Sequence, residues 1–184
     1  MSIIKHKSVI AGRGTLYNGN INIYAGPNGI NIGNFCAIGP GLTLMNINHD
    51  YNYPAMQYTF YKKYFRKNHP GIRTQNKNYS KGKITIGNDV WFGDKVSVMS
   101  GVTIGDGCVI GLGSVVTKDL EPYTICAGIP CKKIKYRFSK EIIEYLLELK
   151  WWNWSDDKIK RNSDFFASSL ENISLDELKN IVKE

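Results

Sequence analysis

Three histidines, His6, His49 and His69, offer the simplest proton-transfer chemistry in this chain. Histidine has an unperturbed pKa of about 6.5, so much of it is neutral near pH 7 and can accept a proton from a hydroxyl group. His6 lies in a segment with little pattern, and His69 stands before Pro70 in a lysine-rich stretch, where we expect a solvated loop residue. His49 stands where a regular repeat gives way to an irregular segment. Because a lone histidine is more often structural or solvated, these positions alone do not assign a general base.

Basic side chains, which can bind anionic groups, gather in one part of the chain. The net charge is +8, from 24 basic and 16 acidic residues. Residues 51–83 contain no acidic residue and account for this charge through Lys62, Lys63, Arg66, Lys67, Arg73, Lys77, Lys81 and Lys83. A positive charge can attract nucleic acid, an anionic membrane or a phosphorylated ligand. Because the rest of the chain is near neutral and contains no RNA-binding motif, we expect no nucleic-acid partner.

The cysteines and the apolar runs indicate the cellular compartment. Cys36, Cys108, Cys126 and Cys131 form no CxxC pair, and residues 1–14 contain no long apolar stretch of the kind found in signal peptides. We therefore expect reduced thiols in a cytoplasmic protein. No apolar run approaches the roughly 18 residues of a transmembrane helix, so we expect no membrane span.

A six-residue repeat occupies residues 86–121. Apolar residues recur at Ile86, Phe92, Val98, Ile104, Ile110 and Val116, and a second set follows each of them by four residues: Val90, Val96, Val102, Cys108, Ser114 and Leu120. In a helix, at about 100° per residue, this spacing would scatter the apolar side chains around the axis. In an extended chain the even spacings place all of them on one side. The repeat therefore predicts short strands, joined by turns, that wind into a coil with an apolar interior.

The repeat also extends toward the N-terminus, with one interruption. It recurs at Ile32 and Ile38, and weaker traces occur at Ile10, Leu16 and Ile23. Residues 46–83 break the pattern. A segment of this length without a repeat is long for a structureless loop, and such loops are usually functional. We expect it to project from the surface of the coil.

The C-terminal part has a different composition. All 18 glycines lie between Gly12 and Gly128, and residues 139–184 contain none. Ser139 and Ser155 are placed to cap helices, and Ser174 with Glu177 forms a capping box. We therefore expect a coil domain over residues 1–138 and a helical segment over residues 139–184 that caps one end of the coil.

Three motifs resemble the hexapeptide-repeat acyltransferases. Residues 86–93, Ile-Gly-Asn-Asp-Val-Trp-Phe-Gly, resemble a signature of that family, and residues 45–50, Met-Asn-Ile-Asn-His-Asp, resemble the loop that carries its catalytic histidine. Residues 115–119, Val-Val-Thr-Lys-Asp, with the later Gly-Ile-Pro at 128–130, resemble its coenzyme A segment. Arg137-Phe138 and residues 149–154, Leu-Lys-Trp-Trp-Asn-Trp, are similar to the xenobiotic acetyltransferase branch. That branch includes chloramphenicol and streptogramin O-acetyltransferases and relatives that acetylate sugars of surface polysaccharides.

The resemblance implies a fold and an assembly. The fold is mainly β, a left-handed parallel β-helix in which three hexapeptides make one triangular turn, here with a projecting loop and a C-terminal helical segment. The assembly is a homotrimer with each active site between two subunits. An ordinary β-sandwich with some Ile-Gly pairs is the alternative fold, and six repeats in strict phase argue against it.

The resemblance also implies a reaction: transfer of an acetyl group from acetyl-CoA to a hydroxyl, without a metal or a covalent enzyme intermediate. His49 matches the catalytic histidine and would act as general base, with Asp50 or a backbone carbonyl to orient it. A backbone N–H near Gly93 or Asp94 would stabilise the oxyanion, because corners of the coil leave amides free. Trp91 would line the cleft, or else cover a neighbouring turn or subunit.

Further residues are assigned to coenzyme A and to the acceptor by the same resemblance. The predicted coenzyme A site consists of Trp91, Gly93, Asp94, Leu112, Thr117, Lys118, Lys132 and Lys135, with the lysines facing the phosphates. The predicted acceptor site consists of Met45, Tyr51, Tyr53 and Tyr58. The alternative for the tyrosines is that they fold the loop onto the coil, and the alternative for the lysines is a solvated basic stretch.

The sequence leaves two questions open: which molecule accepts the acetyl group, and whether the protein belongs to another class. We expect a saccharide hydroxyl, on a surface polysaccharide or its precursor, because the segment at 51–83 is basic; the alternative is an antibiotic, streptogramin or chloramphenicol. A zinc enzyme of the carbonic anhydrase type on the same fold would need all three histidines, which include no closely spaced ligand pair. A β-helix protein without catalytic activity is a further alternative.

Overall fold

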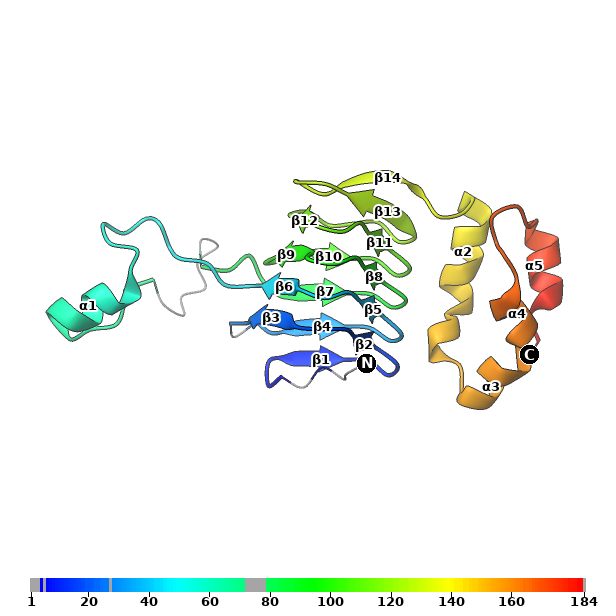
Figure 1. Cartoon of the computed structure of the whole chain (residues 1–184), viewed down its shortest axis with the longest axis horizontal. Coiled ribbons are helices and arrows are strands. Elements are labelled where there is room, and N and C mark those ends of the chain that lie inside the picture. Colours follow the sequence, from blue (N-terminus) through cyan, green and yellow to red (C-terminus); the bar gives the residue numbers. More distant parts are fainter. Residues whose placement is uncertain (1–3, 5, 27, 72–78, 184) are drawn as a thin grey trace.

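Short strands, each followed by a turn, wind into a coil that forms the main body of the protein (Figure 1). The computed structural model describes residues 4, 6–26, 28–71 and 79–183. The successive turns of the coil consist of β1 (Val9–Ala11), β2 (Leu16–Tyr17) and β3 (Ile21–Tyr24); β4 (Ile30–Ile32), β5 (Ala37–Ile38) and β6 (Leu42–Met45); β7 (Ile84–Ile86), β8 (Trp91–Phe92) and β9 (Ser97–Met99); and β10 (Thr103–Ile104), β11 (Val109–Ile110) and β12 (Val115–Val116). A last, incomplete turn consists of β13 (Thr124–Ala127), followed by β14 (Lys132–Tyr136).

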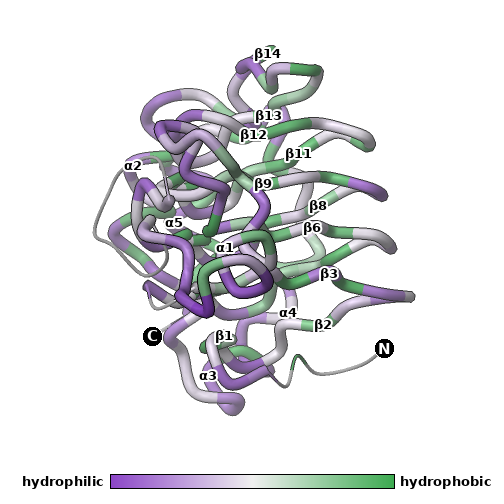
Figure 2. Tube along the Cα trace, turned by 90° about the vertical axis from the view of Figure 1, so that its left-hand side faces the viewer, coloured by the Kyte–Doolittle hydropathy of each residue, from purple (hydrophilic) through white to green (hydrophobic). Residues whose placement is uncertain are grey.

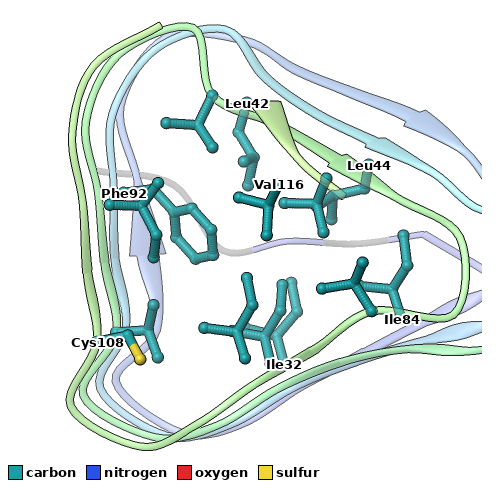
Figure 3. Packing of buried hydrophobic residues seen from close by; sticks show 14 of the residues in the cluster. Ile32, Leu42, Leu44, Ile84, Phe92, Cys108 and Val116 are labelled. Atoms are coloured by element: carbon teal, nitrogen blue, oxygen red, sulfur yellow. The ribbon is translucent and has the colours of Figure 1, made fainter. Parts of the chain in front are cut away.

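Strands in successive turns pair side by side and form three sheets. We call β1-β4-β7-β10 the first sheet, β2-β5-β8-β11-β13-β14 the second sheet and β3-β6-β9-β12 the third sheet. The neighbouring strands are parallel, except that β14 runs antiparallel to β13. Seen down the coil in Figure 3, the sheets enclose a triangular interior. The parallel coil that the six-residue repeat predicts is therefore confirmed.

The interior of the coil is built from the repeat positions themselves. All of the predicted inward positions of residues 86–121 are buried: Ile86, Val90, Phe92, Val96, Val98, Val102, Ile104, Cys108, Ile110, Ser114, Val116 and Leu120. Ser114 is the one polar side chain among them, and its hydroxyl donates to the carbonyl of Gly111 at 2.6 Å. Because this hydroxyl is hydrogen-bonded, its burial costs little.

At one corner of the coil, successive turns approach too closely for a side chain. A Cβ atom on Gly93 would lie 2.6 Å from the backbone nitrogen of Leu112 in the next turn. Stacked strands in a sheet are only about 4.8 Å apart, so a side chain pointing along the stack has no room. The glycine that follows the first repeat position is therefore required by the stacking at this corner.

Residues 46–83, which we call the insert, leave the coil after β6 and return to it at β7. The insert contains the helix α1 (Tyr58–Phe65), none of whose residues is buried. In Figure 1 α1 lies well to one side of the stacked strands, and in Figure 2 it lies in front of them. The coil continues across the insert in register, since β4 pairs with β7 and β6 with β9. Arg73 and Lys77 of the predicted basic segment lie outside the described residues.

Residues 139–183, which we call the helical tail, form a set of short helices with a core of their own. They are α2 (Lys140–Leu149), a 3-10 turn (Trp151–Asn153), α3 (Asp156–Arg161), α4 (Ser163–Ala167) and α5 (Leu175–Ile181). The predicted caps are confirmed: Ser139 and Ser155 cap α2 and α3, and Ser174 forms a capping box with Glu177 at the start of α5. A membrane-crossing helix needs about 20 apolar residues, and no helix in the described part of the chain meets that requirement.

From the sequence we expected the helical tail to cap one end of the coil. Instead it lies beside the stacked turns (Figure 1). Arg13 in the first turn forms an ion pair with Asp156 at 2.7 Å and also donates to the carbonyl of Trp154. Phe35 in the second turn packs against Trp151, with 5.3 Å between the ring centroids. These contacts run along the corner between the first and second sheets. The expectation of an end cap was wrong because aromatic side chains at this corner provide an apolar surface for the tail.

Arg137, just before the helical tail, contacts the same corner between the first and second sheets. Its Nη1 atom donates to the carbonyl of Gly107 at 2.7 Å and to the Oδ2 atom of Asp89 at 3.1 Å. Its guanidinium also lies over the rings of Tyr123 and Phe138, at 5.4 and 5.0 Å from the ring centroids. Burial raises the pKa of Asp89, and the neighbouring Arg137 charge acts in the opposite direction.

Candidate active site

His49 stands at the start of the insert, four residues after β6, with its ring exposed to solvent. Its Nδ1 atom lies 2.8 Å from the backbone carbonyl of Met56. Because a carbonyl oxygen can only accept a hydrogen bond, the proton of the neutral ring is on Nδ1 and the lone pair is on Nε2. Of the two orienting groups considered from the sequence, the structure provides the backbone carbonyl. The carboxylate of Asp50 is buried and accepts from the backbone N–H of Asn52 at 3.1 Å.

His69 is not the solvated loop residue that the sequence predicts. Only 1% of its surface is exposed. Its Nδ1 atom accepts from the backbone N–H of Gly71 at 2.9 Å, and its Nε2 atom lies 3.1 Å from the carbonyl of Ala55. The expectation was wrong because three tyrosine rings pack around the imidazole. These are Tyr53, Tyr58 and Tyr61, whose ring centroids lie 5.0, 4.5 and 4.8 Å from that of His69.

The predicted acceptor residues divide into two groups. Tyr53 and Tyr58 belong to the cluster around His69 and so pack within the insert, whereas the alternative left open for them was to fold it onto the coil. The ring of Tyr58 also lies 4.6 Å from the ring of His49, centroid to centroid, and therefore still borders the site. Tyr51 is 68% exposed. Met45, half-buried on β6, is paired with Met99 of β9 and lies four residues before His49.

Two of the predicted coenzyme A residues lie at the same edge of the third sheet as His49. Thr117 and Lys118 follow β12 directly, and both are exposed. Since β6, β9 and β12 are neighbours in this sheet, the backbone of Thr117 lies about two strand spacings, or roughly 10 Å, from that of Met45. A ligand that extends from His49 across the neighbouring strands β9 and β12 would therefore contact Thr117 and Lys118.

Four other predicted residues lie at or beyond the opposite edge of that sheet. Trp91 is exposed on β8 of the second sheet, and Gly93, Asp94 and Leu112 lie at the corner where the second sheet turns into the third. Of the two amides expected as oxyanion donors, that of Gly93 donates to the carbonyl of Ile110 at 2.8 Å, which leaves that of Asp94. Within the described residues, the amides of Asp94 and Leu112 have no hydrogen-bond acceptor and remain open to a ligand.

This corner precedes β6 along the chain, and His49 follows that strand. Lys95, next to Asp94, is held against the second turn by a bond from its N–H to the carbonyl of Pro40, 2.7 Å long. From Pro40 the chain reaches His49 through β6, whose four residues at about 3.3 Å each span about 13 Å.

The predicted phosphate-binding lysines lie on β14, and all residues of that strand are exposed. Lys133 is engaged by the carboxylate of Glu121 at 2.6 Å, which lowers the pKa of Glu121. Lys132 and Lys135 form no ion pair within the described residues and are available to an anionic ligand. Arg137 is partly buried against Asp89, so it does not belong to a solvated basic stretch.

The histidines are poorly arranged for the zinc alternative. Both ring nitrogens of His69 are engaged by the backbone, and so is Nδ1 of His49. In the described part of the chain, no three histidine, cysteine, aspartate or glutamate side chains gather closely enough to hold a metal ion. The four cysteines are buried and unpaired. Burial raises the pKa of Cys36 to about 11, which keeps that thiol protonated.

Sequence reasoning missed several groups that shape the site. The Met56 carbonyl that orients His49 is a backbone atom and leaves no signal in the residue types. The free amide of Leu112 was missed for the same reason, although the side chain was assigned to the coenzyme A site. His69 has a weak signal that could have been used: it lies among tyrosines at Tyr58, Tyr61 and Tyr64 in an otherwise polar segment.

Comparisons with known proteins identify the family to which the repeat belongs. Residues 83–118 match the family model described as bacterial transferase hexapeptide (six repeats). The chain belongs to the hexapeptide-repeat transferases. It is 44% identical over 142 residues to a chloramphenicol acetyltransferase of Klebsiella aerogenes, covering 75% of this chain and 66% of that protein. It is 50% identical over 100 residues to a probable macrolide acetyltransferase of Lysinibacillus sphaericus, covering 54% of each chain.

A solved structure, galactoside acetyltransferase in complex with coenzyme A, is similar to this chain with a TM-score of 0.54 and 36% identity. The likeness covers 71% of this chain and 56% of that one. The chain thus spans 66% or less of the length of these relatives.

Proposed function

We propose that the protein is an acetyl-CoA-dependent O-acetyltransferase that acts on a hydroxyl group of an antibiotic of the chloramphenicol type. The observation that carries this proposal is the arrangement at His49, an exposed residue whose Nδ1–H is bonded to the Met56 carbonyl, which leaves the lone pair on Nε2. An alcohol is a poor nucleophile at neutral pH, so it needs such a base. The similarity to chloramphenicol and macrolide acetyltransferases supports both the activity and the kind of acceptor.

The proposed reaction is a direct transfer. Nε2 of His49 takes the proton of the acceptor hydroxyl while the hydroxyl oxygen attacks the thioester carbonyl carbon. A C–O bond forms, the C–S bond breaks through a tetrahedral intermediate, and the leaving thiolate takes the proton back from Nε2. The Met56 carbonyl keeps the ring in one tautomer and stabilises the imidazolium while it exists. No covalent enzyme intermediate is required.

The open groups of the coil supply the remaining contacts. We assign the free amides of Asp94 and Leu112 to the oxyanion or the pantetheine amides, and Lys132 and Lys135 to the phosphates of coenzyme A. Thr117 and Lys118 would line the path from His49. Because His49 and Asp94 lie at opposite edges of the third sheet, the proposal includes a neighbouring subunit. We expect the homotrimer and the left-handed winding that the family resemblance implies.

A saccharide hydroxyl, the acceptor first expected from the sequence, is the second candidate. Exposed Lys62, Lys63 and Arg66 lie on or beside the aromatic helix α1, and this surface favours an anionic or ring-shaped acceptor. The galactoside acetyltransferase is also a relative whose name includes a sugar. We rank the antibiotic first because the similarity to the chloramphenicol acetyltransferase covers more of both chains.

The test is an acetyl-transfer assay with acetyl-CoA and a panel of acceptors: chloramphenicol, a streptogramin, a galactoside and an acidic oligosaccharide. Product is detected by mass spectrometry as the gain of one acetyl group. We expect turnover of chloramphenicol, and a loss of about 10²- to 10⁴-fold in kcat for His49→Ala. His6→Ala is the matched control, because that residue lies in the first turn of the chain away from the insert, and it should retain full activity.

The outcomes separate the parts of the proposal. Turnover of a saccharide but not of chloramphenicol would contradict the proposed antibiotic acceptor, while the proposed acetyl transfer to a hydroxyl would stand. Full activity of His49→Ala would overturn the general base. If none of the acceptors is acetylated by the folded protein, the proposal as a whole is wrong.

A further inference from the structure

The insert contains a buried histidine that the proposed reaction does not use. His69 and His49 both pack against the ring of Tyr58, whose centroid is 4.6 Å from that of the His49 ring and 4.5 Å from that of the His69 ring. A polar ring that is 99% buried is expensive unless each of its nitrogens has a partner. His69 has both partners, and both are backbone groups of the insert.

These partners determine the tautomer of His69. The N–H of Gly71 points at Nδ1, so this nitrogen must carry a lone pair. The hydrogen of the neutral ring is therefore on Nε2, from where it is donated to the carbonyl of Ala55 at 3.1 Å. His49 has the opposite arrangement, with the hydrogen on Nδ1 and the lone pair on Nε2.

His69 is hydrogen-bonded to Ala55, which directly precedes Met56, the residue whose carbonyl orients His49. Ala55 and Met56 are consecutive, so the carbonyl held by His69 and the carbonyl held by His49 belong to adjacent peptide units. The helix α1 follows immediately and has no buried residue that could anchor this segment to the coil. The position of the Met56 carbonyl therefore depends on contacts within the insert, and the bond from His69 to Ala55 fixes the peptide unit directly before it.

We propose that His69 is a positioning residue for the catalytic base: it holds the segment at Ala55 and Met56 and thereby keeps His49 in the tautomer with its lone pair on Nε2. This inference rests on the proposed function of His49. Without the bond to Ala55, the Met56 carbonyl is less well fixed, and the imidazole of His49 can also adopt the tautomer with hydrogen on Nε2. That tautomer cannot accept the proton of the acceptor hydroxyl.

Two substitutions separate the two bonds of His69. In His69→Gln, the side-chain amide nitrogen takes the place of Nε2 and can still donate to Ala55. In His69→Asn, the shorter amide takes the place of Nδ1 and can still accept from Gly71, but it does not reach Ala55. The proposal predicts that glutamine preserves the function of His49 and that asparagine does not.

The first measurement is ¹⁵N NMR of the imidazole nitrogens, which reports tautomers without any turnover. The chain contains only three histidines, so the signals can be assigned by replacing each in turn. We expect hydrogen on Nδ1 of His49 and on Nε2 of His69 in the unchanged protein. In His69→Asn we expect a mixture of tautomers at His49, and in His69→Gln the unchanged His49 signals.

The second measurement is steady-state kinetics with acetyl-CoA and the acceptor that the panel identifies. A displacement of about 1 Å at a catalytic group costs up to about 10²-fold. We therefore expect kcat to fall 10- to 100-fold in His69→Asn with little change in KM for acetyl-CoA, whereas His69→Gln stays within about threefold of the unchanged protein. The melting temperature of the coil should be the same in both variants, because the insert lies outside it.

Unchanged His49 signals in His69→Asn would overturn the positioning role, whether or not any acceptor is turned over. Equal loss of kcat in both variants would overturn it too, because it would mean that His69 only maintains the fold of the insert. If the NMR result is as expected but no acceptor is acetylated, the positioning of His49 stands and the proposed activity fails.

Discussion

Replacing Arg137 by methionine should loosen the junction between the coil and the helical tail, and the loss should depend on pH. The Nη1 atom donates to Gly107 and Asp89, and the guanidinium covers Tyr123 and Phe138. Methionine keeps much of the apolar stem but removes both hydrogen bonds and the charge. Hydrogen bonds to charged groups contribute about 1.5–3 kcal/mol and cation–π contacts about 0.5–1 kcal/mol. Because the Arg137 and Asp89 side chains are 26% and 30% exposed, we expect a total loss of about 2–4 kcal/mol at pH 7.5.

The pH dependence follows from Asp89. Burial raises the pKa of this carboxyl group in the folded protein, and Arg137 opposes the rise. Without Arg137 the folded-state pKa rises further above the unfolded value. A carboxyl group whose pKa is raised on folding contributes fully to stability below its unfolded pKa of about 3.9. This contribution is lost as the pH rises through the folded pKa. The loss in Arg137→Met should therefore shrink to about 1–2 kcal/mol at pH 4 and grow as the pH is raised.

The assay is urea unfolding at pH 4 and pH 7.5, at one protein concentration because oligomers unfold in a concentration-dependent way. Tryptophan fluorescence reports mainly on the tail, since three of the four tryptophans lie in residues 151–154. Asp89→Asn is the matched partner, because asparagine tolerates the left-handed backbone of residue 89, where φ is 53°. In the double variant the loss at pH 7.5 should be about 1–2 kcal/mol smaller than in Arg137→Met. A loss that is equal at both pH values and is not reduced in the double variant would refute this account.

Three further predictions concern the coil and the tail. Phe92→Ala removes a fully buried ring from the coil interior and should cost about 3–5 kcal/mol of unfolding free energy in denaturant titrations. Gly107→Ala should lower the unfolding free energy clearly more than Gly113→Ala in the same titration. Both glycines have φ of 68°, but a Cβ at residue 107 would lie 2.5 Å from a buried tyrosine ring, whereas at residue 113 it would meet nothing within 4 Å. Equal losses would contradict the role of the ring. Glu177→Gln should lower stability above the unfolded glutamate pKa of about 4.3, because hydrogen bonds from Ser174 lower the pKa of Glu177, and this loss should disappear as the pH falls through the lower folded-state pKa. A pH scan of melting temperature checks this.

The interior of the coil could be predicted from the sequence because its repeat is local. Inward positions such as Phe92 and Ile110 recur every six residues, and one register of strands places all of them inside. The position of the tail could not be predicted, because contacts such as Phe35 with Trp151 join residues far apart in the chain and follow no period. Helix caps report where a helix begins and say nothing of the surface on which it packs.

The candidate site could be predicted only in part. His49 was proposed as the base through its motif, and Thr117 and Lys118 lie at the edge of the third sheet from which the chain leads to it. Of the two amides expected near the oxyanion, the sequence could not tell Gly93 from Asp94; the hydrogen-bond ladder of the second sheet continues one residue beyond β8 and engages Gly93 with the carbonyl of Ile110. The environment of His69 was also wrong, since the sequence around it is polar and basic and its burial arises from tyrosines that converge only after folding.

The continuity of the coil across the insert has a consequence for variation among such proteins. The strands on either side, β4 with β7 and β6 with β9, pair as if residues 46–83 were absent. Lengthening a loop at such a point costs only about 0.6 kcal/mol for each doubling of its length. Under the proposed function, exchange of this one segment should change the acceptor preference and leave the coil, to which we assign the acyl donor, intact. A chimera that carries another insert between Met45 and Ile84 should fold with the same coil.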